Sequence, residues 1–259
     1  MITLSNKNQT ATITKGELVS YKVNGYEIIH QKGSPGWGHS DTEMFPIIGP
    51  TDKTGFRVQV PKGNALQDQH GLLREMDYET LMSDTQSVHL QKTYKAGTLV
   101  INSKYPEKST ILRLIWPYDF QFKKSFKLHE DYLEITFSVS GEKDMPFMIG
   151  YHPAFKLRTD NPVISTDTNT YSLDEIMAAG NKAVEVPDTT SLSLKDEKEI
   201  RIKTTGFGNF MLWSPVATMV CVEPITFYPY GAAQSSLHEG FMYLNKQEEI
   251  FTIQMGLKK

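Results

Sequence analysis

Apolar and polar residues alternate along several long stretches of this chain, and this alternation is the feature that most limits its fold. In residues 132–139 every second residue is apolar and the residues between are mostly polar, and residues 120–128 and 249–257 repeat the pattern. Because successive side chains of a β-strand point to opposite faces, such segments predict strands with one buried face. Many strands of this kind predict an all-β fold, with large antiparallel sheets stacked face to face.

Turn and helix signals agree with this architecture. Asn24 and Gly25 separate two strand-like runs and predict a type I′ hairpin turn, and residues 129–131 join two further strands. Residues 172–180 begin with a serine cap and end in glycine, which predicts one short helix. Residues 156–199 are polar and rich in turns, and we interpret them as an excursion rather than a separate domain. We therefore expect a single β-sandwich domain over residues 1–259.

Charge and cysteine content limit the function. The chain has 27 Lys and Arg against 30 Asp and Glu, with no long run of either sign, so nothing predicts a nucleic-acid or anionic-membrane partner. No stretch approaches the roughly 20 apolar residues of a membrane span. The N-terminus lacks the apolar core of a signal peptide, and the single cysteine, Cys221, lies in an apolar run. We expect a cytoplasmic protein, either a monomer or a weak homodimer.

Two segments place a proton-transfer group at the end of an apolar run. His152 lies in the hexapeptide Gly-Tyr-His-Pro-Ala-Phe at 150–155, directly after the apolar run 145–149, which we interpret as a buried strand. Pro153 biases His152 toward extended backbone. Glu223 follows Val-Cys-Val and precedes a proline. A histidine and a carboxylate on strand ends suit a proton relay. Alternatively, His152 is a core histidine bonded to a backbone carbonyl, and Glu223 is paired with a cation.

A third segment, Gln-His-Gly-Leu-Leu-Arg at 69–74, is a glycine-containing loop. Its His70 and Arg74 can both donate hydrogen bonds to sugar or carboxylate oxygens, although His70 can equally well brace its own loop. Aromatic residues that can stack on a sugar, or else fill the core, are Trp37, Phe45, Trp213, Phe227 and Tyr228.

Other chemistries have weaker signals. The sequence contains no P-loop, no dinucleotide-binding glycine motif and no His-Glu-x-x-His zinc helix. His70, His152 and Glu223 match the residue types of a two-histidine, one-carboxylate iron site, but no two of them are close in sequence. An iron site therefore remains an outside alternative.

Four motifs in order resemble the aldose 1-epimerase (galactose mutarotase) family, in particular its shorter bacterial members. They are Met-Phe-Pro-Ile-Ile-Gly at 44–49, the loop at 69–74, the hexapeptide at 150–155, and Leu-Trp-Ser-Pro at 212–215 followed by Cys-Val-Glu-Pro at 221–224. The resemblance runs through most of the chain. It implies a large antiparallel β-supersandwich, in agreement with the alternation, and a mutarotase that needs no cofactor or metal.

Carried over to this chain, the resemblance implies that His152 is the general acid and Glu223 the general base. It places His70 near the sugar ring oxygen and Arg74 in the wall of the sugar pocket. Phe45 lies in the early Phe-Pro motif, and Phe227 stands for the aromatic residue that usually follows Glu-Pro. Both are expected to contact the sugar.

The chain also departs from the family pattern. Pro50 stands where members often have a basic residue, which leaves Lys53 or Arg57 as substitutes, and no aspartate lies in a matching sugar-binding context. Two alternatives therefore stay open. One is a non-catalytic or regulatory carbohydrate-binding protein on the same fold. The other is a hexose-6-phosphate 1-epimerase, which requires several Arg or Lys side chains around the phosphate.

Overall fold

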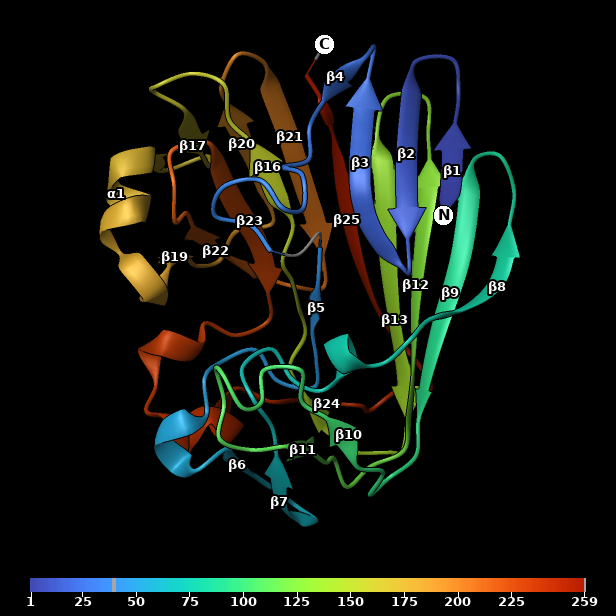
Figure 1. Cartoon of the computed structure of the whole chain (residues 1–259), viewed down its shortest axis with the longest axis vertical. Coiled ribbons are helices and arrows are strands. Elements are labelled where there is room, and N and C mark those ends of the chain that lie inside the picture. The colour runs from blue at the N-terminus through green and yellow to red at the C-terminus, as the bar shows by residue number, and fades with distance from the viewer. Residues whose placement is uncertain (39–40, 259) are drawn as a thin grey trace.

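The main feature of the molecule is a nine-stranded antiparallel sheet (Figure 1). The structure is a computed structural model that describes residues 1–38 and 41–258. On the long central strands every second side chain is buried, so one face of the sheet is apolar. In spatial order the strands are β18 (Thr170–Ser172), β17 (Val163–Ser165), β20 (Ser191–Lys195), β21 (Glu199–Thr205), β25 (Glu249–Leu257), β13 (Leu133–Gly141), β12 (Phe120–Leu128), β9 (Ser87–Tyr94) and β8 (Glu79–Ser83).

A second, six-stranded sheet packs on this apolar face. Phe45 lies with its ring centroid 4.9 Å from that of Phe120 and 5.2 Å from that of Phe122. Tyr151 lies 5.2 Å from Phe137 in the same way. These aromatic contacts join strands of the two sheets into one core. The strands of the second sheet are β19 (Val184–Val186), β22 (Asn209–Trp213), β23 (Met219–Ile225), β15 (Gly150–Tyr151) and β5 (Glu43–Met44), with β16 (Ala154–Lys156) also paired to β23.

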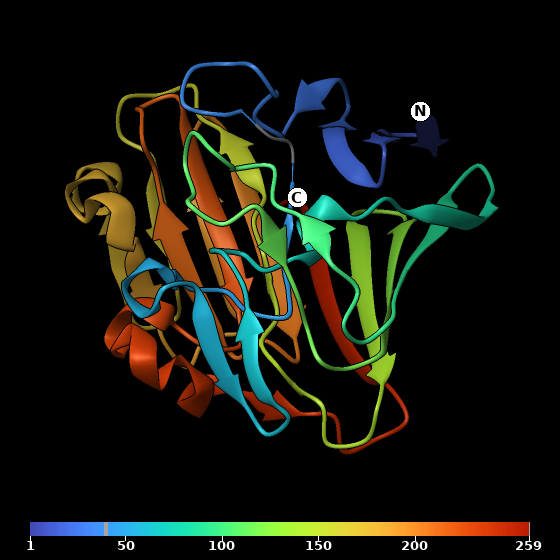
Figure 2. The same ribbon diagram turned by 60° about the horizontal axis from the view of Figure 1, so that its bottom comes forward.

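A four-stranded N-terminal sheet covers another part of the nine-stranded sheet (Figures 1 and 2). The Tyr21 hydroxyl donates a 3.3 Å hydrogen bond to the carbonyl of Met255, and the side-chain Nδ2 of Asn6 donates a 2.8 Å bond to the carbonyl of His129. The buried residues of this sheet belong to the same continuous core. Its strands are β1 (Ile2–Ser5), β2 (Gln9–Thr14), β3 (Glu17–Val23) and β4 (Tyr26–Glu27).

The remaining elements are short. Two-stranded pairs are β6 (Arg57–Val60) with β7 (Gly63–Leu66), seen in cyan in Figure 2, β10 (Val100–Ile101) with β11 (Arg113–Leu114), and β14 (Pro146–Phe147) with β24 (Met242–Tyr243). The helical segments are α1 (Leu173–Ala178) and the 3₁₀ turns η1 (Asp52–Thr54), η2 (Leu73–Glu75), η3 (Gly180–Lys182), η4 (Pro229–Gly231) and η5 (Gln234–Gly240). Within the described part of the chain, no helix is long and apolar enough to cross a membrane.

Most of the predicted elements are confirmed. Residues 120–128 and 249–257 form β12 and β25 with those limits, and 132–139 lies within β13 apart from its first residue. Asn24 and Gly25 turn between β3 and β4 with φ of 50° and 78°, the left-handed values that a type I′ turn requires. The short helix is α1, whose N-cap Ser172 forms a capping box with Glu175.

Two predictions need correction. Residues 145–149 are all buried, as expected, but they do not form one strand. Only β14 is strand there, because the amide of Met148 bonds instead to the carbonyl of Pro46, and that of Ile149 to Thr226 Oγ1. Residues 156–199 are also more than an excursion. They supply β17, β18 and β20 to the nine-stranded sheet and β19 to the six-stranded sheet.

Candidate functional site

Strand β23 is the platform of the site, because it is buried on both of its faces. Val220 and Val222 point into the main core between the two large sheets. Alternation along the strand therefore sends Cys221 and Glu223 to the opposite face. On the neighbouring strand β22, Trp213 lies directly opposite Cys221. The apolar strand β23 thus holds the carboxylate of Glu223 in a buried position outside the main core.

His152 lies across from Glu223 because two short strands pair with β23 in one continuous register. Gly150 of β15 pairs with the residue two positions after Glu223, and Ala154 of β16 pairs with the residue two positions before it. His152, midway between, therefore faces Glu223 across the ladder. Its backbone N–H donates a 2.9 Å hydrogen bond to the carbonyl of Thr42. As a result, Nε2 of His152 lies 3.4 Å from Oε1 of Glu223.

Glu223 is held in a dry environment. Its side chain is 1% exposed, and burial raises its pKa well above the usual value of a glutamate. Among residues 1–38 and 41–258, no group donates a hydrogen bond to its second oxygen, Oε2. The charge of this carboxylate also affects the pKa of Tyr230. Burial, followed by the charge of Glu223, raises the pKa of Tyr230 to about 12.

Two tryptophans form an aromatic wall beside His152. The Trp37 ring lies 5.2 Å from the imidazole at an angle of 36°, and the Trp213 ring lies 6.1 Å from it at 80°. Trp37 and Cys221 are also members of one small apolar cluster, separate from the main core. The two indoles therefore border the imidazole with apolar ring faces.

The loop with His70 is fastened to the segment after β5. The His70 carbonyl accepts a 3.2 Å hydrogen bond from the Phe45 amide, and the His70 amide donates a 3.1 Å bond to the carbonyl of Ile48. Gly71 has a φ of +69°, and a Cβ there would lie 2.2 Å from the Phe45 carbonyl oxygen. Only glycine fits at this approach of two backbones. The His70 ring meets the His152 ring edge-on, with centroids 5.3 Å apart.

Positive charge surrounds the His70 ring. Burial lowers its pKa well below the usual value of a histidine, and the charges of His152, Arg74 and Lys104 lower it further. Arg74 lies in η2, and its Nε is 3.8 Å from Oε1 of Glu75. The structure thus brings together His70, Arg74, His152 and Glu223 from three separate parts of the chain.

Lys104 is a residue that the sequence did not single out. Its Nζ donates 3.0 Å hydrogen bonds to Oδ1 of Asp68 and to the carbonyl of Gln69, the residue before His70. Asn102 holds the other oxygen of Asp68 at 2.9 Å. No motif marks Lys104, because it lies in the connection between β10 and β11, 35 positions after Gln69, the loop residue to which it bonds.

The two phenylalanines expected to contact sugar have other surroundings. Phe45 is fully buried in the main core, against Phe120, Phe122 and Phe147, so its part in the site is the backbone contact with the His70 loop. The Phe227 ring is partly buried and covers Gly240 of η5. The aromatic rings that do pack on His152 are those of the two tryptophans.

Three of the site's side chains can serve together as metal ligands. One ligating atom from each of His152, Cys221 and Glu223 lies within 4.8 Å of the other two. This group differs from the iron alternative raised by the sequence, because Cys221 takes the place of His70.

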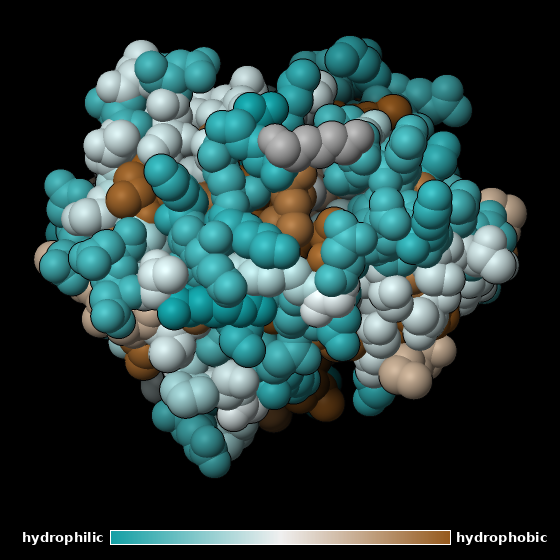
Figure 3. Space-filling view, turned by 90° about the horizontal axis from the view of Figure 1, so that it is seen from above, coloured by the Kyte–Doolittle hydropathy of each residue, from teal (hydrophilic) through white to brown (hydrophobic). Residues whose placement is uncertain are grey.

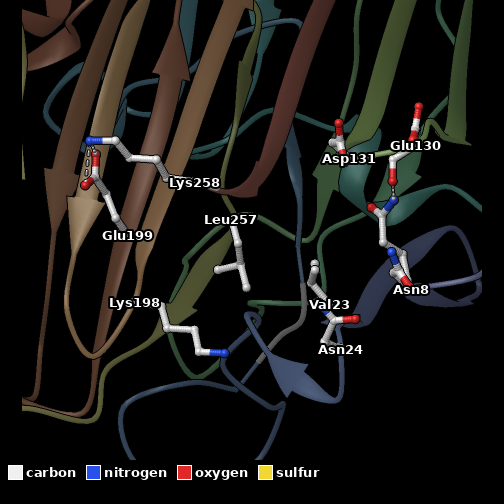
Figure 4. Close-up of a pocket in the computed structure, with 10 residues that line it drawn as sticks. Asn8, Val23, Asn24, Glu130, Asp131, Lys198, Glu199, Leu257 and Lys258 are labelled. Atoms are coloured by element: carbon white, nitrogen blue, oxygen red, sulfur yellow. Dashed lines mark hydrogen bonds and ion pairs between the residues drawn. The ribbon is translucent and has the colours of Figure 1, made fainter.

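A separate groove of about 440 Å³ opens near the C-terminal end of the chain (Figure 4). It is lined by residues of the N-terminal sheet, the 129–131 turn and β25, and its Lys258 pairs with Glu199 at 2.8 Å. None of the residues proposed from the sequence lines it. The face shown in Figure 3 is mostly hydrophilic, with apolar side chains visible near its centre.

Comparison with known proteins identifies the family of this chain. Residues 1–246 match the family model described as aldose 1-epimerase. The chain belongs to the aldose 1-epimerase family. The resemblance inferred from the four motifs is therefore confirmed. A search of curated proteins finds no match.

Solved structures of this fold cover nearly the whole chain. A galactose mutarotase-like protein from Lactobacillus casei is 18% identical, covers 100% of both chains and has a TM-score of 0.80. A galactose mutarotase related enzyme from Lactobacillus acidophilus is 19% identical, covers 100% of this chain and 97% of its own, and has a TM-score of 0.76. A putative aldose 1-epimerase from Escherichia coli is 14% identical, covers 99% and 98%, and has a TM-score of 0.72. These similarities confirm the predicted mutarotase-like β-sandwich fold.

Proposed function

We propose that this member of the aldose 1-epimerase family interconverts the α and β anomers of a free aldose. The observation that carries the proposal is the 3.4 Å separation between Nε2 of His152 and a carboxylate oxygen of the buried Glu223. The anomeric hydroxyl and the ring oxygen of a pyranose are both bonded to C1. An acid and a base that act on these two oxygens at once must therefore lie side by side.

In the proposed reaction, Glu223 removes the proton of the anomeric hydroxyl while His152 protonates the ring oxygen. The bond between C1 and O5 breaks and leaves an open-chain aldehyde. Rotation about the bond between C1 and C2 exposes the other face of the carbonyl. Ring closure with the proton flow reversed then gives the other anomer. Each proton transfer contributes on the order of 10²–10⁴-fold to the rate.

The surrounding groups support the same reaction. A carboxylate in a dry pocket is a stronger base than one in water, because it lacks the stabilisation of its charge by solvent. In this proposal His70 donates a hydrogen bond near the sugar ring oxygen, and Arg74, whose charge acts on the His70 ring, contributes positive charge to the site. Trp37 and Trp213 supply apolar faces for stacking.

The test is the rate of anomer equilibration, followed by polarimetry or NMR across a panel of aldoses. We expect wild-type protein to accelerate at least one sugar, and Glu223→Gln to lower that rate by about 10²–10⁴-fold. Glu130→Gln makes the same chemical change in an exposed turn and should leave the rate unchanged. If no sugar is accelerated, the alternative of a carbohydrate-binding protein is favoured. If Glu223→Gln equals wild type, Glu223 is not the base.

A second candidate, a sugar-phosphate substrate, is favoured by one cavity beside the site. A pocket of about 420 Å³ is lined by Lys53, Lys182 and Tyr230 among others. The Tyr230 hydroxyl lies 3.2 Å from Nε2 of Gln69, in the loop that carries His70. Two lysines in a cavity that also contacts Tyr230 suit an anionic group on the substrate.

The same assay separates the two substrates. If the substrate is a hexose 6-phosphate, the wild type should prefer it to the free hexose, and Lys53→Met with Lys182→Met should abolish this preference without slowing the free hexose. Equal rates on both sugars in the wild type would contradict this candidate.

A further inference from the structure

Cys221 lies beside the His152–Glu223 pair but takes no part in the proposed proton transfers. It is two residues from Glu223 on β23, so both side chains leave the same face of the strand. One ligating atom from each of Cys221, Glu223 and His152 lies within 4.8 Å of the others, and all three residues are buried. Imidazole, thiolate and carboxylate are the ligands that Zn²⁺ takes in proteins.

The free oxygen of Glu223 is a second, independent sign of a ligand. Within the described residues nothing donates a hydrogen bond to Oε2, although the side chain is only 1% exposed. Buried carboxylate oxygens are normally satisfied by donors or by cations, because an unpaired one loses its hydration without compensation. The carboxylate therefore keeps one uncompensated oxygen, Oε2, beside Oε1, the oxygen that faces His152, and a bound cation would compensate its charge.

The spacing fits a tetrahedral ion. With Zn–N and Zn–O bonds of about 2.0–2.2 Å, tetrahedral angles place the two ligand atoms about 3.4 Å apart. Nε2 of His152 and Oε1 of Glu223 are separated by 3.4 Å. A sulfur and an oxygen ligand lie roughly 3.6 Å apart in the same geometry. Because the three ligating atoms lie within 4.8 Å of one another, Sγ of Cys221 needs to move inward by about 1.2 Å at most.

We propose that His152, Cys221 and Glu223 bind one Zn²⁺ ion, and that this ion inhibits the enzyme. A mixed sulfur, nitrogen and oxygen set favours Zn²⁺ over Mg²⁺, which prefers oxygen ligands alone. Three protein ligands leave one tetrahedral position for water. Zn²⁺ in this position occupies the lone pair of the His152 imidazole and the carboxylate of Glu223, so neither can exchange protons with a sugar. The inhibitory part of the inference rests on the proposed mutarotase activity, whereas the binding part does not.

Binding is tested first with metal alone. Wild-type protein titrated with ZnCl₂ against a chromophoric chelator should take up one Zn²⁺ per chain at micromolar concentrations, and MgCl₂ should not compete. CoCl₂ should produce a thiolate-to-cobalt charge-transfer band in the near ultraviolet. The chain has a single cysteine, so this band can arise only from Cys221. Zinc uptake without the cobalt band would overturn the assignment.

Variants test the ligand set. Cys221→Ser should weaken Zn²⁺ binding by more than about 100-fold, since loss of even an outer-sphere partner typically costs 10–100-fold. His89→Asn removes an exposed histidine of β9 and should bind Zn²⁺ as wild type does. Thermal unfolding checks that Cys221→Ser is folded. If this variant does not fold, the cobalt band of the wild type alone decides whether Cys221 is a ligand. Equal Zn²⁺ affinity in folded Cys221→Ser and wild type would overturn the proposal.

Activity measurements then test the inhibition. Mutarotation by wild type should fall to background when Zn²⁺ saturates the protein, and a chelator should restore it. Cys221→Ser, measured against its own metal-free rate, should resist the same Zn²⁺ concentration. If Zn²⁺ binds and Co²⁺ shows the thiolate charge-transfer band, but wild-type activity is unchanged, the metal site is correct and the proposed inhibition is wrong. If no sugar is turned over at all, the proposed function fails while the cobalt and zinc titrations still decide the site.

Discussion

Nζ of Lys124 lies 2.7 Å from Oδ2 of Asp41 in the interior of the molecule, and neither side chain is more than 2% exposed. The same ammonium group lies 2.5 Å from Oε1 of Glu43, and the Tyr151 hydroxyl donates a hydrogen bond to Asp41. Tyr151 immediately precedes His152 in the chain. This buried ion cluster therefore joins β12 to the two segments that hold the backbone of His152 in place.

Substitution of Lys124 should be strongly destabilising. Lys124→Met removes the cation that the two buried carboxylates share, so we expect the free energy of unfolding to fall by about 3–5 kcal/mol in urea titrations. Adding Asp41→Asn and Glu43→Gln removes the stranded charges and should recover a large part of the loss. If the single variant is as stable as wild type, the cluster does not stabilise the fold.

The adjacent lysine provides a matched control. Lys123 alternates to the opposite face of β12 and lies 3.6 Å from Glu248, with both side chains more than a third exposed. Such a pair contributes about 0–1 kcal/mol, so Lys123→Met should be nearly as stable as wild type. A comparable loss in both variants would mean that the effect of Lys124 comes from side-chain length and not from burial.

Lys92 should make stability depend on pH. It is buried near Glu43 and Lys124, its Nζ donates a 2.9 Å hydrogen bond to the Leu73 carbonyl, and it lies 4.0 Å from the centre of the Tyr78 ring. Burial lowers its pKa from 10.5 to about 8. Between these pH values the unfolded chain holds a proton that the folded chain has lost, so the contribution of Lys92 to stability rises with pH.

The measurement is a comparison of wild type with Lys92→Met by urea unfolding from pH 8 to pH 10.5. Wild type should gain up to about 3 kcal/mol relative to the variant over this range. Lys127→Met, at an exposed position of β12, should show no such change relative to wild type. A constant difference between wild type and Lys92→Met would contradict the buried-amine interpretation.

The sequence predicts the strands well but not the buried ion pairs, because alternation is a local pattern and the ion pairs join distant segments. Period-two alternation assigns each residue to a face, and it places Lys124 on the same face of β12 as Phe122 and Phe126. The pattern does not tell which segment covers that face. Asp41 and Glu43, the partners of Lys124, lie more than 80 positions earlier, and only the tertiary structure brings them together.

For the candidate site, too, the sequence identifies residues but not the contacts between them. The motifs around His152, Glu223 and His70 named residues that the structure brings together, because each motif combines a titratable group with a proline or glycine that fixes the backbone. The register across β15, β16 and β23, which sets His152 opposite Glu223, is a property of strand pairing and not of any local motif. Lys104 was missed for the same reason, since only its long-range hydrogen bonds mark it.

Gly71 should tolerate no side chain. Gly71→Ala places a Cβ 2.2 Å from the Phe45 carbonyl oxygen at a φ of +69°, so the loop must move away from β5 and carry His70 with it. We expect a loss of more than about 2 kcal/mol in thermal or urea unfolding, together with weaker sugar binding. Gly25→Ala, at a φ of +78° with no atom within 4 Å, has only the backbone strain and should lose about 1 kcal/mol. Equal losses in the two variants would show that the contact with Phe45 relaxes freely.

His152 and Glu223 should act as one unit, because each proton transfer is useful only if the other accompanies it. His152→Asn and Glu223→Gln should each lower the rate of anomer equilibration by about 10²–10⁴-fold, and the double variant should be about as slow as the slower single variant. The cycle is measured by polarimetry on an aldose that wild type accelerates, with circular dichroism to check folding. Two independent contributions would instead multiply, and the double variant would then be slower by the product of the two factors. That result would contradict a concerted transfer across the 3.4 Å pair and would favour separate roles for the two side chains.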